Sequence, residues 1–319
     1  MSDILVSINC ITYNHEKYIA EAIESFLMQN TDFKFEILIH DDASTDRSAE
    51  IIREYEQKYP DLIKPIYQTE NQYSKKVQVD RLNTERAQGK YIAVCEGDDF
   101  WTDPYKLQKQ VDYMEAHPEV SLCVHAGDVV LAKDRKVLRK NRPSKFSRFL
   151  TVEEIIKLGG DFCVTSAMFY RTELDRTRPD FFNVMPDISD YHLGINLALQ
   201  GAVYYMDECM SAYRVGVVGS WTVSNYSNLK KKKEHNQRLY QMLDEINEYT
   251  NYQYNETIQH TKNELELLLL LEERKFKEAK SDVYKEIYAS FGVKRKVIIT
   301  LDKYAPALSN YLRAVKRGY

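Results

Sequence analysis

The stretch Tyr91-Ile92-Ala93-Val94-Cys95-Glu96-Gly97-Asp98-Asp99 decides the fold, because a short apolar run passes directly into three acids within four residues. Apolar runs of this length, bounded by turn residues, are typical of buried strands. Just before it, residues 79–88 have a helical pattern that Gly89 closes. The stretch therefore predicts a helix, then a strand, then a group of acids at the carboxyl end of that strand.

The same alternation of apolar strands and helices runs back to the N-terminus. Apolar runs predict strands over 4–11, 35–39, 63–67 and 91–95, and helical stripes predict helices over 16–29, about 44–59 and 79–88. Ser44-Thr45-Asp46 supplies the N-cap signal for the second helix. Alternation of this kind predicts an α/β fold with a mostly parallel central sheet flanked by helices.

Polar residues follow three of these strands. Tyr13 comes after the first strand, Asp41-Asp42 after the second and Asp98-Asp99 after the fourth. Ligands of parallel sheets bind beyond the carboxyl ends of the strands, so we expect these side chains to converge on one crevice. Asp41 and Asp42 alone are also compatible with a simple turn, because aspartate often opens one.

The acids after residue 95 carry more information than the pair after the second strand. Carboxylates this close repel one another unless a cation offsets their charge. Carboxylate oxygens suit a hard ion such as Mg²⁺ or Mn²⁺, which can also bridge to substrate phosphates. A solvated acidic turn is the alternative interpretation.

Several segments, in this order, resemble glycosyltransferase family 2 with the GT-A fold. They are Ser7-Ile8-Asn9-Cys10-Ile11-Thr12-Tyr13-Asn14, Ile39-His40-Asp41-Asp42-Ala43-Ser44-Thr45-Asp46, Gly89-Lys90-Tyr91-Ile92, and Glu96-Gly97-Asp98-Asp99 with Pro104 beyond. Each segment is weak alone, and the ordered set is specific. The resemblance covers about residues 3–222.

The resemblance implies a nucleotide-sugar donor, usually a UDP-sugar, held with a divalent metal, Mn²⁺ or Mg²⁺. It implies a role for each matching residue: Tyr13 stacks near the base with Ile11 and Thr12 beside it, Asp42 bonds the base edge, Asp98 lies by the ribose and the metal, and Asp99 is the principal metal ligand. A metal held in this way stabilises the negative charge of the departing diphosphate. Lys75, Lys76, Arg81 and Arg86 are candidates to assist the phosphates, with solvated surface as the alternative for each.

Residues 185–192 place two acids, Asp187 and Asp190, before a helical stretch over 193–200 that Gly201 ends. An N-cap aspartate is a common structural use of such a residue. The resemblance implies instead that Asp190 is the general base. It would accept the proton of the acceptor hydroxyl while that oxygen attacks the anomeric carbon, so that one displacement inverts the configuration. Asp187 is the second candidate for the base.

One position departs from the family pattern. Many relatives have a histidine after the last strand of this region, and here Gly216 stands there. Water and phosphate oxygens would then complete the metal shell, or His125 or His192 would substitute. Gly216 and Gly219 suit a mobile loop that closes over the donor, with Trp221 as its apolar lid, although a lone tryptophan is more often a core anchor.

Two regions are expected along the chain. Residues 1–224 form the GT-A catalytic domain, with a nucleotide-sugar half over about 1–118 and an acceptor half over about 119–224. Residues 225–319 form a helical C-terminal region, and within it 293–319 is a basic amphipathic end. That end suits the surface of an anionic membrane, or it is an ordinary surface helix. A helical dimer is a further alternative, so the oligomeric state stays open.

Composition and charge limit where the protein is expected to act and which partners it is expected to bind. The formal charge of −4 over 319 residues argues against a general nucleic-acid binder. No apolar run approaches the ~20 residues that cross a bilayer, and Met1-Ser2-Asp3-Ile4 does not resemble a signal peptide. We therefore expect a cytoplasmic protein, peripheral at the inner face of the membrane if residues 293–319 bind there. The five cysteines are expected in the core in reduced form.

The expected function is an inverting transfer of a hexosyl or N-acetylhexosaminyl group from a UDP-sugar to a saccharide or lipid-linked glycan, in cell-surface polysaccharide synthesis. One alternative is a sugar nucleotidyltransferase. Such an enzyme would normally have a glycine-rich phosphate loop after the first strand, where this chain has Thr12-Tyr13-Asn14-His15. The other alternative is a catalytically impaired glycan-binding scaffold of the same fold.

Overall fold

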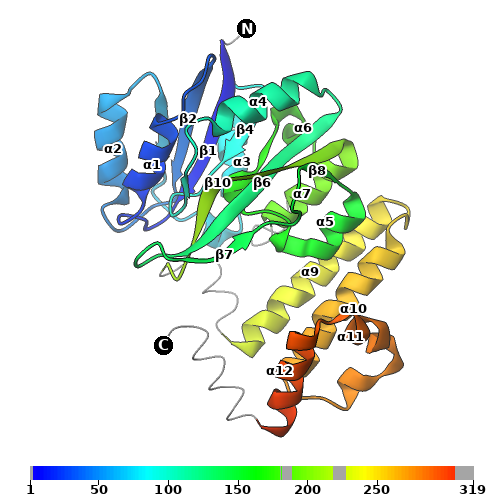
Figure 1. The fold of residues 1–319 in the computed structure, drawn as a ribbon. Helices are drawn as coiled ribbons and strands as arrows, with labels where there is room; N and C mark the ends of the chain where they lie inside the picture. Colours follow the sequence, from blue (N-terminus) through cyan, green and yellow to red (C-terminus); the bar gives the residue numbers. More distant parts are fainter. Residues whose placement is uncertain (1–2, 180, 182–188, 218–227, 306–319) are drawn as a thin grey trace. The chain divides into compact units, whose positions relative to one another are not determined.

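A computed structural model describes residues 3–179, 181, 189–217 and 228–305 (Figure 1). Contacts within the chain divide it into two compact units, Met1–Val223 and Ser224–Tyr319. The described part of the first unit contains one ten-stranded sheet. Eight of its strands have the order β3-β2-β1-β4-β9-β6-β10-β5, and the other two, β7 and β8, pair with β6 and β10. The sheet is mixed and mostly parallel, which confirms the predicted α/β class.

The first half of the sheet is built from alternating strands and helices: β1 (Ile4–Thr12), α1 (Ile19–Leu27), β2 (Lys34–Asp41), α2 (Ser48–Lys58), β3 (Ile63–Tyr67), α3 (Val79–Arg86) and β4 (Tyr91–Val94). All four strands are parallel. A short 3-10 helix, η1 (Tyr73–Lys75), lies in the loop between β3 and α3. Every strand and helix predicted for this half is present.

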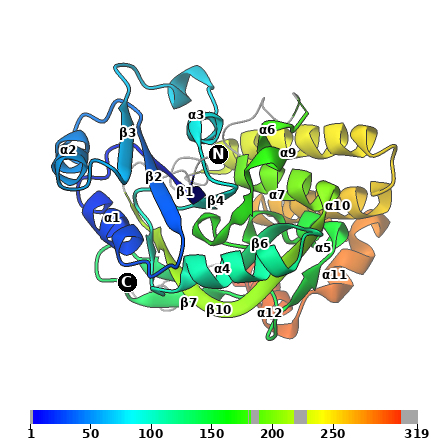
Figure 2. The same ribbon diagram turned by 90° about the horizontal axis from the view of Figure 1, so that it is seen from above.

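Alternate residues of β1 face opposite sides of the sheet, and helices cover both sides. Val6, Ile8 and Cys10 are buried in the hydrophobic core that α1, α2 and α4 complete. Between them, Ser7 and Asn9 face the other side, where the Asn83 amide of α3 donates to the Asn9 side chain at 2.9 Å. Figure 2 shows α1 and α4 on one side of the strands and α3, α6 and α7 on the other.

The second half of the unit is less regular. Its strands are β5 (Phe100–Trp101), β6 (Val120–Leu131), β7 (Val137–Asn141), β8 (Arg148–Leu150), β9 (Phe169–Arg171) and β10 (Ala202–Val215). Its helices are α4 (Lys106–Ala116), α5 (Val152–Leu158), α6 (Thr172–Arg176) and α7 (Ser189–Gln200), with short 3-10 turns η2 (Gly159–Asp161) and η3 (Thr165–Ala167). Strand β9 runs antiparallel to both β4 and β6 and so joins the two parallel parts of the sheet.

The second unit is helical in its described residues. It contains α9 (Leu229–Tyr249), α10 (Asn255–Glu272), η6 (Glu278–Lys280), η7 (Asp282–Tyr284), α11 (Lys285–Ser290) and α12 (Val293–Tyr304). The ion pairs Lys232–Glu272 and Asp244–Lys262 join residues whose numbers rise along α9 and fall along α10, so the two helices are antiparallel. None of the helices in the described ranges is both long enough and apolar enough to cross a membrane.

Candidate functional site

Hydrogen bonds between backbone groups bring three strand ends together. The Thr12 carbonyl at the end of β1 accepts the Asp42 N–H at 2.9 Å, and the Ile11 carbonyl accepts the Gly97 N–H at 2.9 Å. Gly97 allows this approach because a Cβ there would lie 2.7 Å from Thr12 Oγ1. The end of β1 therefore lies between the Asp41-Asp42 turn and the Glu96-Asp99 turn.

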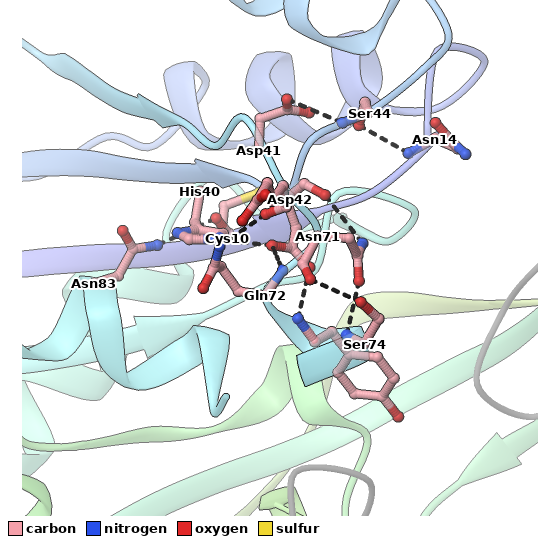
Figure 3. Close-up of polar contacts among 12 residues, drawn as sticks. Cys10, Asn14, His40, Asp41, Asp42, Ser44, Asn71, Gln72, Ser74 and Asn83 are labelled. Carbon is pink, nitrogen blue, oxygen red and sulfur yellow. Dashed lines mark hydrogen bonds and ion pairs between the residues drawn. The ribbon is translucent and has the colours of Figure 1, made fainter. Parts of the chain in front are cut away.

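Asp42 is a buried carboxylate that holds the loop after β3 (Figure 3). Its oxygens accept the backbone N–H groups of Gln72 at 2.7 Å and Tyr73 at 3.0 Å, and its carbonyl accepts the Asn71 amide at 3.0 Å. His40 Nε2 lies 3.5 Å from the same carboxylate. A carboxylate has about four acceptor positions, so these bonds leave room for a further donor such as a base edge.

The residues around the end of β1 differ in exposure. The Tyr13 side chain is 45% exposed, as a stacking surface has to be, whereas Thr12 and Asp41 are buried. Thr12 Oγ1 and Asp41 Oδ1 are buried oxygens without a hydrogen-bond partner among the described residues. Burial raises the pKa of Asp41. These unsatisfied oxygens favour a polar ligand at this end of the sheet, because unpaired buried polar groups are costly.

The turn with Asp98 and Asp99 is fixed by Arg214, near the end of β10. The Arg214 N–H donates to Asp99 Oδ1 at 2.8 Å, and its buried guanidinium donates to the Asp98 carbonyl and to Glu21. The guanidinium also lies 4.3 Å from the centre of the Phe100 ring. Asp99 Oδ2 is buried and has no partner among the described residues. One oxygen of Asp99 is thus held and the other is available.

The electrostatics of this turn favour a bound cation. Burial, together with the charges of Asp98 and Glu96, raises the pKa of Asp99 well above its ordinary value. Burial and the charges of Asp98, Asp190 and Asp80 likewise raise the pKa of Glu96. A divalent cation would relieve this repulsion. The residues that the structure describes contain no group of three acid, histidine or cysteine side chains that could hold a metal ion. The unpaired Asp99 Oδ2 is an oxygen of the kind that Mg²⁺ or Mn²⁺ binds.

The histidine beside this turn is His15, in the loop after β1. Its Nε2 lies 3.7 Å from Asp98 Oδ2. His125 and His192 are both fully buried, and His125 Nδ1 lies 2.7 Å from the Ala126 carbonyl. Burial lowers the pKa of His192 to about 3. At Gly216, φ is +86°, a backbone conformation that favours glycine over histidine.

Asp190 lies in the first turn of α7 and is partly exposed. Its Oδ1 accepts the Tyr191 N–H at 2.7 Å, and its Oδ2 accepts the Thr165 hydroxyl at 3.2 Å. Burial raises the pKa of Asp190, which suits a group that has to take a proton. The charge of Asp190 contributes to the raised pKa of Glu96, so Asp190 and the acidic turn share one electrostatic environment.

Three of the four basic residues that are candidates to assist the phosphates, all between β3 and β4, have local partners. Lys75 pairs with Glu70, Arg81 pairs with Glu85, and the Arg86 guanidinium donates to the Lys64 carbonyl at 2.7 Å. The fourth, Lys76, is exposed and has a φ of +64°. Asp187, Gly219 and Trp221 lie outside the described residues.

Sequence reasoning did not single out His15, Thr165 or the loop that Asp42 holds. His15 had a signal, since it directly follows the quoted Tyr13-Asn14 pair. Thr165 had none, because it is 25 positions away from Asp190 and meets it only through the packing of α7. The backbone groups of Gln72 and Tyr73 carry no side-chain signal at all.

Comparisons with known proteins point to one protein family. The family model described as glycosyl transferase family 2 matches residues 7–178. An uncharacterised protein of Mycobacterium tuberculosis strain H37Rv is 38% identical over 233 residues, which is 71% of this chain and 63% of that protein. The chain thus spans less than two thirds of that relative. The Bacillus subtilis strain 168 protein named putative teichuronic acid biosynthesis glycosyltransferase TuaG is 30% identical over 214 residues, 66% of this chain and 79% of TuaG.

Solved structures with the same fold include a mannosyltransferase and S. aureus TarS. Mannosyltransferase PcManGT from Pyrobaculum calidifontis, in complex with GDP-Man and Mn²⁺, has a TM-score of 0.58 at 16% identity and is matched over 99% of this chain and 85% of its own. S. aureus TarS 1–349 in complex with UDP-GlcNAc has a TM-score of 0.55 at 18% identity, over 94% and 79%. These likenesses show the GT-A type of fold, and the family match over more than half of the chain shows that this protein belongs to glycosyl transferase family 2.

Proposed function

We propose that the protein is an inverting glycosyltransferase that moves a sugar from a nucleoside diphosphate, most simply UDP, to an acceptor hydroxyl. The observation that carries this proposal is the joining of the Asp42 turn and the Glu96-Asp99 turn to the end of β1, with Asp99 Oδ2 unpaired beside them. Support comes from TarS, which was solved with UDP-GlcNAc, and from PcManGT, which was solved with GDP-Man and Mn²⁺.

Each proposed contact follows from a described position. Tyr13, which is 45% exposed, offers its ring to the base, with Ile11 and Thr12 beside it. Asp42 uses its remaining acceptor capacity at the base edge, and Asp98 lies at the ribose. Asp98 and Asp99 would hold Mn²⁺ or Mg²⁺, which when bound would supply a Lewis acid for the negative charge of the leaving diphosphate.

Asp190 performs the proton transfer in this proposal. The acceptor hydroxyl gives its proton to the Asp190 carboxylate while its oxygen forms a bond to the anomeric carbon. The bond from that carbon to the phosphate oxygen breaks at the same time, and its electron pair leaves with the diphosphate. Attack from the face opposite the leaving group inverts the anomeric configuration. The sugar transferred is a hexosyl or N-acetylhexosaminyl group in this proposal, and the residues that contact the donor sugar decide which of the two.

The experiment is a donor screen. The protein is incubated with Mn²⁺ and a panel of UDP-sugars and GDP-mannose, and released nucleoside diphosphate is measured with and without saccharide acceptors. Release from one donor, lost in Asp99→Asn and Asp190→Asn, supports the transferase. Pyrophosphate release from UTP and a sugar 1-phosphate would instead identify a nucleotidyltransferase. Absence of both reactions, with no thermal stabilisation by any donor, would favour a binding scaffold.

The exposed helix α12 suggests where the acceptor is found. The exposed residues of α12 combine apolar and basic side chains, and none of the residues Val293–Tyr304 is buried. We propose that 293–319 binds an anionic bilayer surface, which would bring the enzyme to a lipid-linked glycan in polysaccharide synthesis at the inner face of the membrane.

A further inference from the structure

The turn η3 carries the only described side chain that donates a hydrogen bond to the Asp190 carboxylate. Thr165 Oγ1 lies 3.2 Å from Asp190 Oδ2, and the other carboxylate oxygen accepts the Tyr191 N–H at 2.7 Å. Two donors on two different oxygens fix the rotation of a carboxylate. Each oxygen keeps one acceptor position for an incoming hydroxyl.

Buried hydrogen bonds hold η3 in place. Trp101 Nε1 donates to the Ser166 carbonyl at 3.0 Å, Ser166 Oγ donates to Ser211 Oγ at 3.1 Å, and the Gln110 amide donates to the Ala167 carbonyl at 3.2 Å. Trp101 lies in β5, which directly follows Asp98-Asp99 in the sequence. The strand that follows the acidic turn thus also fixes the turn that contacts Asp190.

Close packing supports the same arrangement from two sides. A Cβ on Gly127 of β6 would lie 2.6 Å from Val164, the residue before Thr165. A Cβ on Gly194 of α7 would lie 2.6 Å from the Phe162 ring, three residues before Thr165. Glycine at both positions lets the segment over 162–165 lie against the strand and the helix, and this closeness sets the distance from Thr165 to Asp190.

We infer that Thr165 is a positioning residue for the base: its hydroxyl orients the Asp190 carboxylate and favours its charged form. This inference rests on the proposed role of Asp190. The titratable groups that face Asp190 from described elements are Glu96, after β4, and Cys163, before η3, and the charge of Asp190 raises the pKa of both. The Tyr191 N–H and the Thr165 hydroxyl both lower the pKa of Asp190 against the effect of burial, and Thr165 is the side chain of the two donors.

The test compares Thr165→Val, which keeps the shape and removes the hydroxyl, with Thr165→Ser, which keeps the hydroxyl. The pKa of Asp190 is measured by NMR on protein with ¹³C-labelled aspartate carboxyls, the signal being assigned with Asp190→Asn. Thr165→Val is expected to raise this pKa by about one unit, the order expected for a lost hydrogen bond to a charged group. Thr165→Ser is expected to leave it near the wild-type value.

The second readout is release of UDP from UDP-GlcNAc or UDP-glucose with Mn²⁺ as a function of pH. In Thr165→Val the acid limb of the rate profile moves to higher pH. At pH values below the limb the rate of UDP release is therefore roughly tenfold lower than in the wild type, and this difference shrinks as the pH rises. Thr172→Val, which removes a buried hydroxyl bonded to the Gly89 carbonyl, is the control that loses stability without moving the limb.

The outcomes separate the inference from the proposed function. An Asp190 pKa that is equal in Thr165→Val and Thr165→Ser would overturn the role of Thr165, whatever the activity. A full rate in Asp190→Asn would remove the base assignment, even if the hydrogen bond from Thr165 were confirmed by NMR.

Discussion

Lys106 is a fully buried lysine at the start of α4. Its ammonium donates to Gln110 Oε1 at 2.8 Å and lies 4.2 Å from the centre of the Trp101 ring. Burial lowers the pKa of Lys106 to about 7, whereas in the unfolded chain it titrates near ~10.4. Between these values the unfolded state binds more protons than the folded state, so this group makes the free energy of unfolding rise with pH.

Urea unfolding at several pH values tests this sign. From pH 7 to 9 the Lys106 contribution is at most about 2–3 kcal/mol. Subtracting the Lys106→Met curve from the wild-type curve should leave a positive slope in this interval and no slope below pH 7. Lys109→Met, on the same helix but paired at the surface with Asp103 and Glu208, should keep the wild-type slope. Parallel curves for wild type and Lys106→Met would show that Lys106 is charged in the folded protein.

Substitutions of Asp99 and Glu96 are expected to have different effects, although both residues lie in the acidic turn. Asp99→Asn keeps an oxygen for the Arg214 N–H and removes the proposed metal ligand, so binding of Mn²⁺ with UDP should weaken at least 10- to 100-fold. Glu96→Gln is the matched control and should change binding only a few-fold. Electron paramagnetic resonance of free Mn²⁺ in a UDP titration measures both. Equal losses in the two variants would mean that the turn acts through its summed charge.

At the scale of elements, the packing of α7 depends on one glycine. Gly194 lies one helical turn after Asp190, and a Cβ there would overlap the buried Phe162 ring. Gly194→Ala gains about 1 kcal/mol of helix propensity but should lose about 1–3 kcal/mol to overpacking. We therefore expect a lower melting temperature and a lower rate of UDP release.

Phe162→Leu provides the double-mutant cycle for this contact. In that background Gly194→Ala should be neutral or stabilising, because the shorter side chain leaves room for the methyl group. Calorimetry of the four proteins gives the coupling energy. Additive effects would mean that the helix, and not the ring, accommodates the new Cβ.

The elements also show what the sequence can and cannot predict. Residues 63–67 were predicted as a strand and form β3 with the same ends, because local β-branched and apolar composition decides such a strand. The start of α7 was placed at Leu193 and lies at Ser189, since its first turn contains polar residues. The position of β9 between β4 and β6 was not predicted, because it depends on pairing between residues far apart in sequence. For the same reason Asp98-Asp99 could be predicted from the end of its strand and Thr165 could not.

For the whole molecule, charge and apolar surface are unevenly distributed. Residues 293–319 contain seven basic side chains and one acid, although the whole chain contains 44 basic and 48 acidic residues. Within α12, Val293 is 78% exposed, Val297 51% and Tyr304 72%. A basic segment with exposed apolar side chains gains free energy at an anionic bilayer from both features, about 1 kcal/mol for each basic residue near the surface.

Sedimentation with lipid vesicles tests this surface. The full chain should bind vesicles that contain phosphatidylglycerol, bind pure phosphatidylcholine poorly, and dissociate as salt shortens the screening length below ~10 Å. Val293→Asp with Val297→Asp should abolish binding without unfolding the chain, since neither side chain is buried. Val283→Asp, at a valine that is 62% exposed outside α12, should bind as the wild type does. If the two α12 substitutions instead dissolve a dimer and leave vesicle binding intact, a second copy of the chain covers this face, and another part of the chain binds the vesicles.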